Sequence, residues 1–163
     1  MIDEIPGPLG AGTRENPRLV VESWPAIPTP EGWRILLLRR APASGGFWQG
    51  VSGRVELFDA SLRAAALREI MEETGLAGGI EIVDLGRWIE FRGPMSGTWF
   101  KKRSLGALLP PGVTAEGVNL CDEHDAVEVV TFAEAKSRLR FPENASELIA
   151  LESWLASRPS PRV

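Results

Sequence analysis

The run REIMEETGL, residues 68 to 76, constrains this chain most, because it gathers three carboxylates on one face of a predicted helix. Glu69, Glu72 and Glu73 occupy positions i, i+3 and i+4, so they fall within an arc of about 100°. Glu72 and Glu73 lie in the last turn, where the helix macrodipole disfavours each negative charge by about 0.3–1 kcal/mol. A hard divalent cation such as Mg²⁺ takes oxygen ligands and would compensate this charge. The run therefore predicts a metal site, against the simpler alternative of a solvated acidic face.

The composition is typical of one soluble globular domain. The 163 residues are 44% hydrophobic and 25% charged, which suffices for a sizeable core. The net charge of −4 argues against polymeric nucleic acid and anionic membranes as partners. Cys121 is the only cysteine, so no intrachain disulfide is available and a reducing, cytoplasmic location is expected. The sequence has no signal-peptide pattern and no apolar run that approaches about 18 residues, so no membrane segment is expected.

Apolar patterns and turn residues predict strands, a central helix, further strands and two closing helices. Pro25, Pro28 and Pro30 are expected to form a turn after the first strand. The central helix should begin near Asp59 or Ser61, either of which can cap it, and end at Gly75. Strands are expected at 18–24, 32–40, 47–56, 80–91, 98–109 and 126–132, and helices at 61–74, 132–139 and 144–157. This order indicates an α+β domain with α/β/α layers and a mixed sheet.

The domain organisation is expected to be simple. Residues 1–17 are rich in proline and glycine and are predicted to form a flexible arm. Residues 18–157 are predicted to form a single domain without an internal repeat or linker. Residues 158–163 lack core-forming side chains and are predicted to be a flexible tail.

A glycine loop before the helix completes a longer pattern. Gly53 lacks a Cβ, which lets a backbone carbonyl approach a metal or phosphate closely. Gly53 followed by the complete run Arg-Glu-apolar-x-Glu-Glu-x-Gly-apolar strongly resembles the Nudix hydrolase family. The spacing departs from the family by one residue: the first acidic position falls on Asp59 when counted from Gly53, and on Ala60 when counted from Arg68. The resemblance implies the Nudix fold, an α/β/α sandwich with a mixed central β-sheet and a loop–helix–loop catalytic motif.

The resemblance also implies an activity and roles for residues. The carboxylates of Glu69, Glu72 and Glu73 and the Gly53 carbonyl would hold Mg²⁺, with Mn²⁺ as a substitute. Arg68 would orient a helix glutamate through an ion pair. The implied reaction is hydrolysis of a phosphoanhydride bond in a nucleoside diphosphate linked to another moiety, a small-molecule substrate. Homodimers are frequent in the family.

Two segments outside the helix are similar to one branch of the family. FWQGVSGRVE, residues 47–56, and the stretch from Glu123 to Ile149 resemble the branch that includes dihydroneopterin triphosphate pyrophosphatase. A nucleoside triphosphate or a pterin triphosphate is therefore the expected substrate. Glu123 is expected to be a further metal ligand or a general base, with a polar loop residue as the alternative. His124 and Cys121 are expected to be structural.

Seven residues are candidates for substrate binding. The side chains of Lys101 and Arg103 share one face of a predicted strand, where they would reach phosphates or else protect a solvated edge strand. The arginines near the glycine loop would contact phosphate, and the two aromatic residues beside it would stack on a base or pterin ring, unless they are core residues. The arginines are Arg39, Arg40 and Arg54, and the aromatic residues are Phe47 and Trp48.

Two rival functions use the same fold. A Nudix-fold module that senses a nucleotide without hydrolysing it would be expected to have lost the helix carboxylates, which this chain retains. An isomerase of prenyl diphosphates would be expected to place a catalytic cysteine in the sheet, and nothing in the sequence places Cys121 there. The sequence therefore favours the hydrolase.

Overall fold

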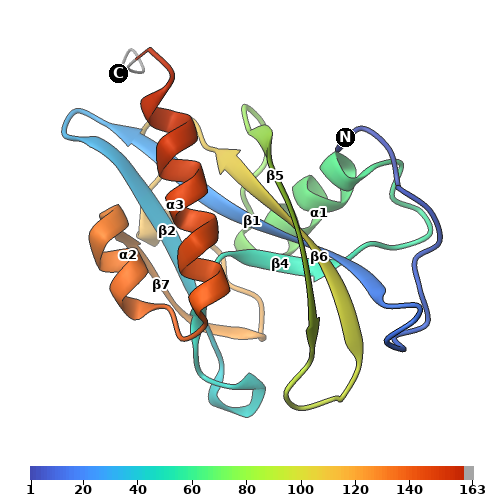
Figure 1. Ribbon diagram of the computed structural model, residues 1–163. Coiled ribbons are helices and arrows are strands. Elements are labelled where there is room, and N and C mark those ends of the chain that lie inside the picture. The colour runs from blue at the N-terminus through green and yellow to red at the C-terminus, as the bar shows by residue number, and fades with distance from the viewer. Residues whose placement is uncertain (160–163) are drawn as a thin grey trace.

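The computed structural model describes residues 1–159, and its centre is a seven-stranded mixed sheet between two helical layers (Figure 1). The main strand order is β3-β2-β1-β6-β5, with β4 also paired to β1 and β7 to β2. Only β1 and β6 run parallel; the other pairs are antiparallel. The strands are β1 (Arg18–Thr29), β2 (Gly32–Arg40), β3 (Trp48–Gln49), β4 (Val51–Arg54), β5 (Glu81–Arg92), β6 (Trp99–Leu108) and β7 (His124–Val130). The α/β/α layering expected from the element order is confirmed.

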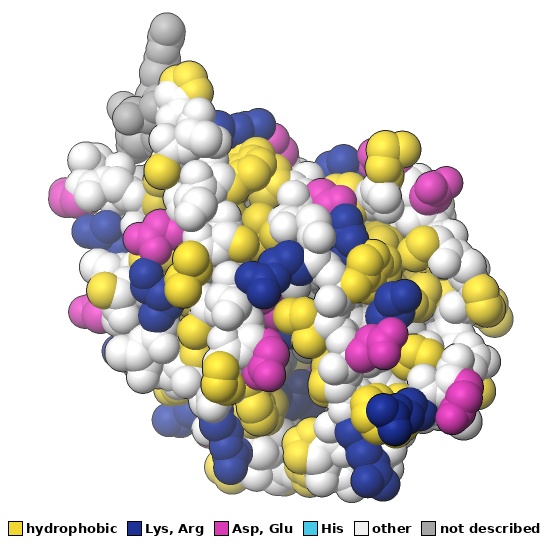
Figure 2. Space-filling view, in the orientation of Figure 1, with side chains coloured by type: hydrophobic (Ala, Val, Ile, Leu, Met, Phe, Trp, Pro, Cys, Tyr) yellow, Lys and Arg dark blue, Asp and Glu magenta, His cyan; other side chains and the backbone are white. Residues whose placement is uncertain are grey.

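The helices form the two outer layers. Helix α1 (Leu62–Thr74) covers one face of the sheet, and α2 (Phe132–Arg138) and α3 (Pro142–Ala156) cover the other. Two short 3₁₀ turns, η1 (Pro42–Ser44) and η2 (Ala115–Gly117), lie in the connections. On the face that bears α2 and α3, basic and acidic side chains are interspersed with apolar ones (Figure 2).

Strand β1 is longer than predicted, because it passes through two of the prolines that were expected to end it. On one side it pairs with β4 as far as Ser23 and with β2 from Ala26 onward. Pro25 lies in the gap between these partners, where no ladder hydrogen bond from its nitrogen is required. Pro28 lies beyond the last β1 residue paired with β6. The turn therefore forms only at Pro30 and Glu31.

Strands β1 and β2 diverge after this turn, and the segment of β3 and β4 fills the space between them. It pairs first with β2, through Trp48 and Gln49, and then with β1. Gly50 marks the crossing, where an added Cβ would lie 2.5 Å from the Ser23 carbonyl oxygen. This wedge brings the end of β4 beneath α1.

Helix α1 begins and ends at the predicted residues. The Ser61 hydroxyl accepts a hydrogen bond from the Ala64 N–H, and Gly75 adopts the left-handed conformation at φ 71°. Leu62, Ala66 and Ile70 are fully buried against the sheet. Their burial fixes the rotation of the helix and so directs Glu69 and Glu73 toward β4.

The N-terminal segment has no helix or strand, but it contacts the domain. Ile2 is buried in the α1-side core, and its carbonyl accepts a hydrogen bond from the Arg63 N–H at 2.9 Å. Asp3 pairs with the Arg63 guanidinium at 2.8 Å. These contacts were not expected from the proline and glycine content of residues 1–17. The predicted tail begins at Arg158, which pairs with Glu81, and its last four residues lie outside the described part of the chain.

Within residues 1–159, no helix combines the length and apolar character needed to cross a membrane. The predicted boundaries of the arm, the domain and the tail remain predictions.

Candidate active site

The end of β4 directs alternate peptide groups toward β1 and toward α1. The Val55 N–H donates to the Leu19 carbonyl, so in this antiparallel ladder Gly53 exchanges its backbone hydrogen bonds with Val21. The Gly53 carbonyl, which was expected to bind a metal, is therefore committed to the sheet. Ser52 precedes Gly53 and Arg54 follows it, so the backbone N–H and C=O groups of both residues point away from β1.

Two contacts to α1 show where these groups point. The Arg54 carbonyl accepts a hydrogen bond from Arg68 Nη2 at 2.8 Å. The Ser52 backbone N–H lowers the pKa of Glu73, which places this N–H beside the Glu73 carboxylate. The backbone oxygen that this strand directs toward the carboxylates is therefore that of Ser52 rather than that of Gly53.

Gly53 contributes through its missing side chain. An added Cβ would lie 1.9 Å from the Glu69 carboxyl carbon, so any side chain would occupy the position of that carboxylate. The Glu69 carboxylate is buried and held by Arg68 Nη1 at 2.7 Å, which limits how far it can yield. A group does approach this glycine closely, as predicted, but that group is the Glu69 carboxylate rather than a metal or a phosphate.

We expect Gly53→Ala to lower kcat/KM by about 100-fold, because a displacement of about 1 Å in a catalytic group has an effect of this size. Its urea midpoint should change much less, because the displaced carboxylate is the end of a side chain. Gly117→Ala is the matched control, since its Cβ would meet nothing closer than 3.7 Å and its activity should stay at the wild-type level. An equal loss of activity and stability in Gly53→Ala would contradict a local effect on Glu69.

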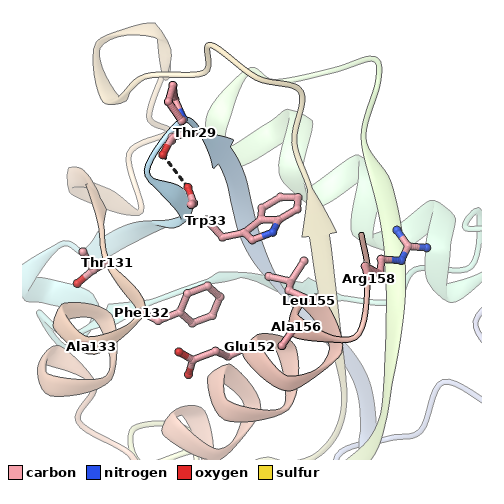
Figure 3. A pocket seen from close by; sticks show the side chains of 11 residues that line it. Thr29, Trp33, Thr131, Phe132, Ala133, Glu152, Leu155, Ala156 and Arg158 are labelled. Carbon is pink, nitrogen blue, oxygen red and sulfur yellow. Dashed lines mark hydrogen bonds between the residues drawn. The ribbon is translucent and has the colours of Figure 1, made fainter. Parts of the chain in front are cut away.

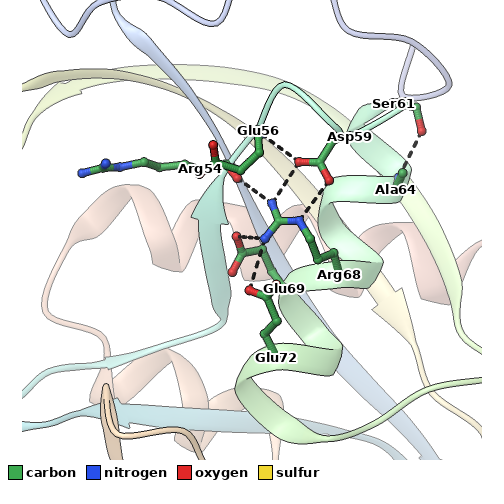
Figure 4. A network of polar contacts seen from close by, with 8 residues as sticks. All are labelled: Arg54, Glu56, Asp59, Ser61, Ala64, Arg68, Glu69 and Glu72. Carbon is green, nitrogen blue, oxygen red and sulfur yellow. Dashed lines mark hydrogen bonds and ion pairs between the residues drawn. The ribbon is translucent and has the colours of Figure 1, made fainter.

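Arg68 is the centre of a network of charged groups (Figure 4). Its Nε and Nη2 donate to the two carboxylate oxygens of Asp59, each at 2.9 Å. Its Nη1 donates to Glu69 at 2.7 Å and to Glu72 at 3.2 Å. The fork of Arg68 thus anchors two helix carboxylates to the loop before the helix.

The one-residue departure in spacing is resolved in favour of Asp59. Its carboxylate also accepts the Glu56 N–H at 2.8 Å. Burial alone would raise the pKa of Asp59, but the hydrogen bonds from Arg68 and Glu56 outweigh it and hold the pKa below its usual value. Ala60 is exposed and its side chain has no charged group. The first acidic position is therefore Asp59.

Glu69 and Glu73 are buried under the edge of β4. Burial raises the pKa of Glu69, and the Arg68 guanidinium only partly offsets this. Burial, followed by the nearby carboxylates of Glu69 and Glu123, raises the pKa of Glu73 to about 9. Among the described residues, Glu73 Oε2 has no hydrogen-bond partner. Glu72 is exposed and extends along the outer side of the network.

The loop before β7 adds the fourth carboxylate. The Glu123 side chain is exposed, and its Oε2 lies 4.0 Å from Arg40 Nη2. His124 is buried, with its Nε2 3.1 Å from Gln49 Nε2 and 3.9 Å from Glu73 Oε2, and its Nδ1 3.7 Å from Cys121 Sγ. Burial lowers the pKa of His124, and Arg40 lowers it further. The surroundings of His124 and Cys121 agree with a structural role for both.

The residues fit a divalent cation, although they do not form a closed cage. Within the described residues, no three acidic, imidazole or thiol groups converge on one point. An unpaired buried oxygen on Glu73, the mutual repulsion of Glu69, Glu73 and Glu123, and the outward Ser52 carbonyl are all features that a cation bound by oxygen ligands would satisfy. The donor set consists entirely of oxygen, as Mg²⁺ requires.

The arginines near the glycine loop point in different directions. Arg40 faces the carboxylates, with its Nε donating to the Ser44 carbonyl at 3.1 Å. Arg39 lies on the other face of the sheet, where it pairs with Asp125 at 2.7 Å. The Arg54 side chain extends away from the Arg68 network, and only its carbonyl joins it (Figure 4).

The two aromatic candidates lie on the α2 and α3 side. The guanidinium groups of Arg39 and Arg138 both lie over the Trp48 ring, at centroid distances of 5.6 and 5.3 Å. Phe47 packs edge to face against Phe141 at 5.2 Å. Both rings already have partners within the protein, and stacking on a substrate remains a prediction.

Lys101 and Arg103 belong to an interior strand, because β6 lies between β1 and β5. The alternative of a solvated edge strand is therefore wrong. Both cations stack on the Trp88 ring, and Arg103 also forms a two-pronged pair with Asp84 at 2.9 and 2.6 Å. Their partners lie on β5 rather than on α1.

Sequence reasoning missed a buried ionic cluster on the opposite face. Lys102 Nζ lies 2.6 Å from Glu22 and 2.5 Å from Glu147, and 3.1 Å from the Asn144 side-chain oxygen. The alternation of side chains along β6 places Lys102 on the face opposite to Lys101 and Arg103. No local signal identified its partners, because Glu22 is 80 residues away in the chain.

A separate hollow of about 830 Å³ lies between the tip of the β1–β2 turn, α2 and the end of α3 (Figure 3). Trp33, Phe132 and Leu155 form its apolar walls, and Thr131 and Glu152 are at its margin. It contains none of the carboxylates described above. The candidate active site is therefore the open group on α1, β4 and the β7 loop.

Comparisons with known proteins point to one family. The NUDIX domain family model matches residues 22–151. Octanoyltransferase of Myxococcus xanthus is 39% identical over 119 residues, which cover 66% of this chain and 29% of that protein. The chain thus spans less than a third of that relative.

Two solved structures share the fold. An Ap4A hydrolase of C. elegans superposes with a TM-score of 0.74 at 20% identity, covering 86% of this chain and 98% of that one. The dihydroneopterin triphosphate pyrophosphohydrolase of E. coli gives a TM-score of 0.65 at 21% identity, covering 80% and 91%. The predicted resemblance is confirmed: the chain belongs to the NUDIX family, whose hydrolases act on nucleoside diphosphate derivatives and generally use divalent metal ions.

Proposed function

We propose that this protein is a Mg²⁺-dependent pyrophosphohydrolase that cleaves a phosphoanhydride bond in a nucleoside diphosphate linked to another moiety. A nucleoside triphosphate or a pterin triphosphate is the favoured substrate. The observation that carries the proposal is the buried Glu73, whose Oε2 has no hydrogen-bond partner among the described residues and lies in the field of Glu69 and Glu123. A folded protein tolerates such an arrangement most readily when a cation completes it.

The protein's contribution is to position oxygen ligands. Glu69, Glu73 and Glu123, with the Ser52 carbonyl, would hold the cation. When bound, the cation would lower the pKa of a coordinated water and neutralise charge on the phosphate oxygens. Arg68, anchored by Asp59, keeps Glu69 and Glu72 in place.

The hydrolysis balances without a further reagent. The oxygen of water attacks a phosphorus atom and the bond from that phosphorus to the bridging oxygen breaks. The leaving phosphate departs with the electron pair of that bond. The proton of the water passes to Glu72, the exposed helix carboxylate that is not assigned to the cation, and from there to solvent.

A substrate panel tests the proposal. Nucleoside triphosphates, nucleotide sugars, dinucleotides and a pterin triphosphate would be assayed with Mg²⁺, and with EDTA, for release of phosphate or pyrophosphate. We expect turnover of at least one compound, lost in EDTA and restored by Mg²⁺ or Mn²⁺. Tight nucleotide binding without turnover of any compound would instead support a sensing module.

Acyl transfer is not proposed for this chain. The Myxococcus xanthus relative bears the name octanoyltransferase, but the match accounts for 29% of that protein. The NUDIX model, in contrast, matches residues 22–151, which are most of this chain.

A further inference from the structure

Arg39 and Arg40 follow one another on β2, so their side chains lie on opposite faces of the sheet. Arg40 is half-buried on the α1 face, where its Nη2 lies 4.0 Å from Glu123 Oε2. Its Nε is fixed by the Ser44 carbonyl at 3.1 Å. Arg40 is therefore a well-placed cation that faces the group of carboxylates.

The pair between Arg40 and Glu123 is loose, and only the side chain of Glu123 is free to leave it. The Glu123 carbonyl accepts the Ala41 N–H at 2.9 Å, which anchors the loop to the strand that carries Arg40. The Glu123 side chain is 62% exposed, so rotation about its own bonds meets little resistance. A distance of 4.0 Å leaves each partner available for a stronger one.

Arg40 and Glu123 act on Glu73 with opposite signs. The carboxylate of Glu123 raises the pKa of Glu73, and the guanidinium of Arg40 lowers it. Both groups are therefore within electrostatic reach of the buried oxygen that lacks a partner. A cation placed at Glu73 would attract Glu123 and repel Arg40, and a phosphate would attract Arg40.

We propose that Arg40 is a positioning residue that holds Glu123 in the resting protein and exchanges it for a substrate phosphate when the metal ion binds. Glu123 then turns toward the cation that Glu69 and Glu73 hold. This exchange rests on the function proposed above. Arg40 opposes metal binding but favours binding of the anionic substrate.

The two roles give opposite changes in one variant. Removal of the Arg40 charge releases Glu123 and removes the repulsion between Arg40 and the metal ion. The protein without substrate should therefore bind Mn²⁺ about fivefold more tightly, which is the typical effect in water of one pair of unit charges 4.0 Å apart, the distance between Arg40 and Glu123. The same variant loses a phosphate contact, so its KM for the substrate should rise about tenfold. A purely structural role of Arg40 would weaken both kinds of binding.

The experiment is a calorimetric titration of Mn²⁺ into the full chain without substrate, followed by steady-state kinetics at saturating metal. Arg40→Gln is compared with Arg39→Gln, a neighbouring arginine on the other face, and with Arg40→Lys, which keeps the charge. Only Arg40→Gln should tighten Mn²⁺ binding. In a Glu123→Gln background the gain from Arg40→Gln should shrink to less than twofold, because the carboxylate that it releases is absent.

Several outcomes would overturn the exchange. They are unchanged or weaker Mn²⁺ binding by Arg40→Gln, an equal gain in Arg39→Gln, or a full gain in the Glu123→Gln background. If Arg40→Gln does not fold, it is replaced by Arg40→Met, which keeps an unbranched side chain. Arg40→Met must then show the same tightening of Mn²⁺ binding. A wild-type protein that neither binds Mn²⁺ nor turns over any substrate contradicts the proposed function itself. Normal wild-type turnover with unchanged Mn²⁺ affinity in Arg40→Gln contradicts only the exchange.

Discussion

Replacement of Glu73 by glutamine is expected to lower turnover by about a thousandfold or more, since a bound metal supplies several kcal/mol of transition-state stabilisation. Glutamine keeps the shape of the side chain but provides only a neutral ligand. The Ser52 N–H can still donate to the amide oxygen, so the local fold should persist. Steady-state kinetics with Mg²⁺ measure the loss, and Glu72→Gln should show a large loss as well.

In metal-free protein, Glu73→Gln should be more stable than wild type at high pH, although its turnover is lower. The pKa of Glu73 is about 9, against an ordinary value of 4.5, so between these limits the folded state binds more protons than the unfolded chain. The contribution of Glu73 to wild-type stability must then fall as pH rises through this window. Glutamine has no such titration, so in EDTA the variant should equal wild type near pH 4 and exceed it at pH 8.

The measurement is urea unfolding at several pH values, in EDTA and in Mg²⁺. Glu152→Gln is the matched control, because Glu152 is half-exposed on α3, where it pairs with Lys136. Its activity and its pH dependence should follow wild type. Wild-type turnover in Glu73→Gln would exclude Glu73 from the catalytic group, and an identical pH dependence would show that its carboxylate is not buried in solution.

The second large effect is a loss of stability, expected when the buried ionic cluster of Lys102, Glu22 and Glu147 loses its cation. Lys102→Met should lower the free energy of unfolding by about 3–5 kcal/mol, because it leaves the carboxylates of Glu22 and Glu147 buried without their cation. Burial already raises the pKa of Glu147, and the adjacent Glu22 adds to this. For a chain of this size the loss corresponds to a fall in Tm of roughly 10 °C. Thermal and urea unfolding measure it.

A neutral version of the whole cluster is the control. Glu22→Gln with Lys102→Met and Glu147→Gln removes every charge, so most of the lost stability should return. Trp24 Nε1, which donates to Glu147 at 2.6 Å, can still donate to the glutamine oxygen. A loss below about 1 kcal/mol in Lys102→Met would indicate that water or a cation replaces the ammonium group.

The parts of the fold that sequence predicted well are those set by neighbouring residues. Helix α1 was predicted with its Ser61 start, one of two candidates, and its Gly75 end, because cap residues and a 3.6-residue period act within a few positions. β1 was predicted too short because its length depends on partners elsewhere. Pro25 is tolerated only since β4 and β2 leave a gap opposite it.

The candidate site divides in the same way. Sequence identified Glu69, Glu72, Glu73 and Arg68, which share one helix. It could not decide whether Asp59 or Ala60 was the acidic partner, because that depends on how the loop closes onto Arg68. Nor could it decide between Arg39 and Arg40, because the choice requires knowing which face of β2 meets α1.

The sequence by itself determined the family and the helix that carries Glu69, Glu72 and Glu73, because these follow from residue types at short, regular spacing. Only the tertiary structure decided that the Ser52 carbonyl faces the carboxylates and that Lys102 is buried between two glutamates. It also decided that Glu123 lies beside Arg40, at the margin of the group of carboxylates. These contacts join segments far apart in the chain. Their geometry is set by strand register and core packing, and no local pattern of residues encodes either.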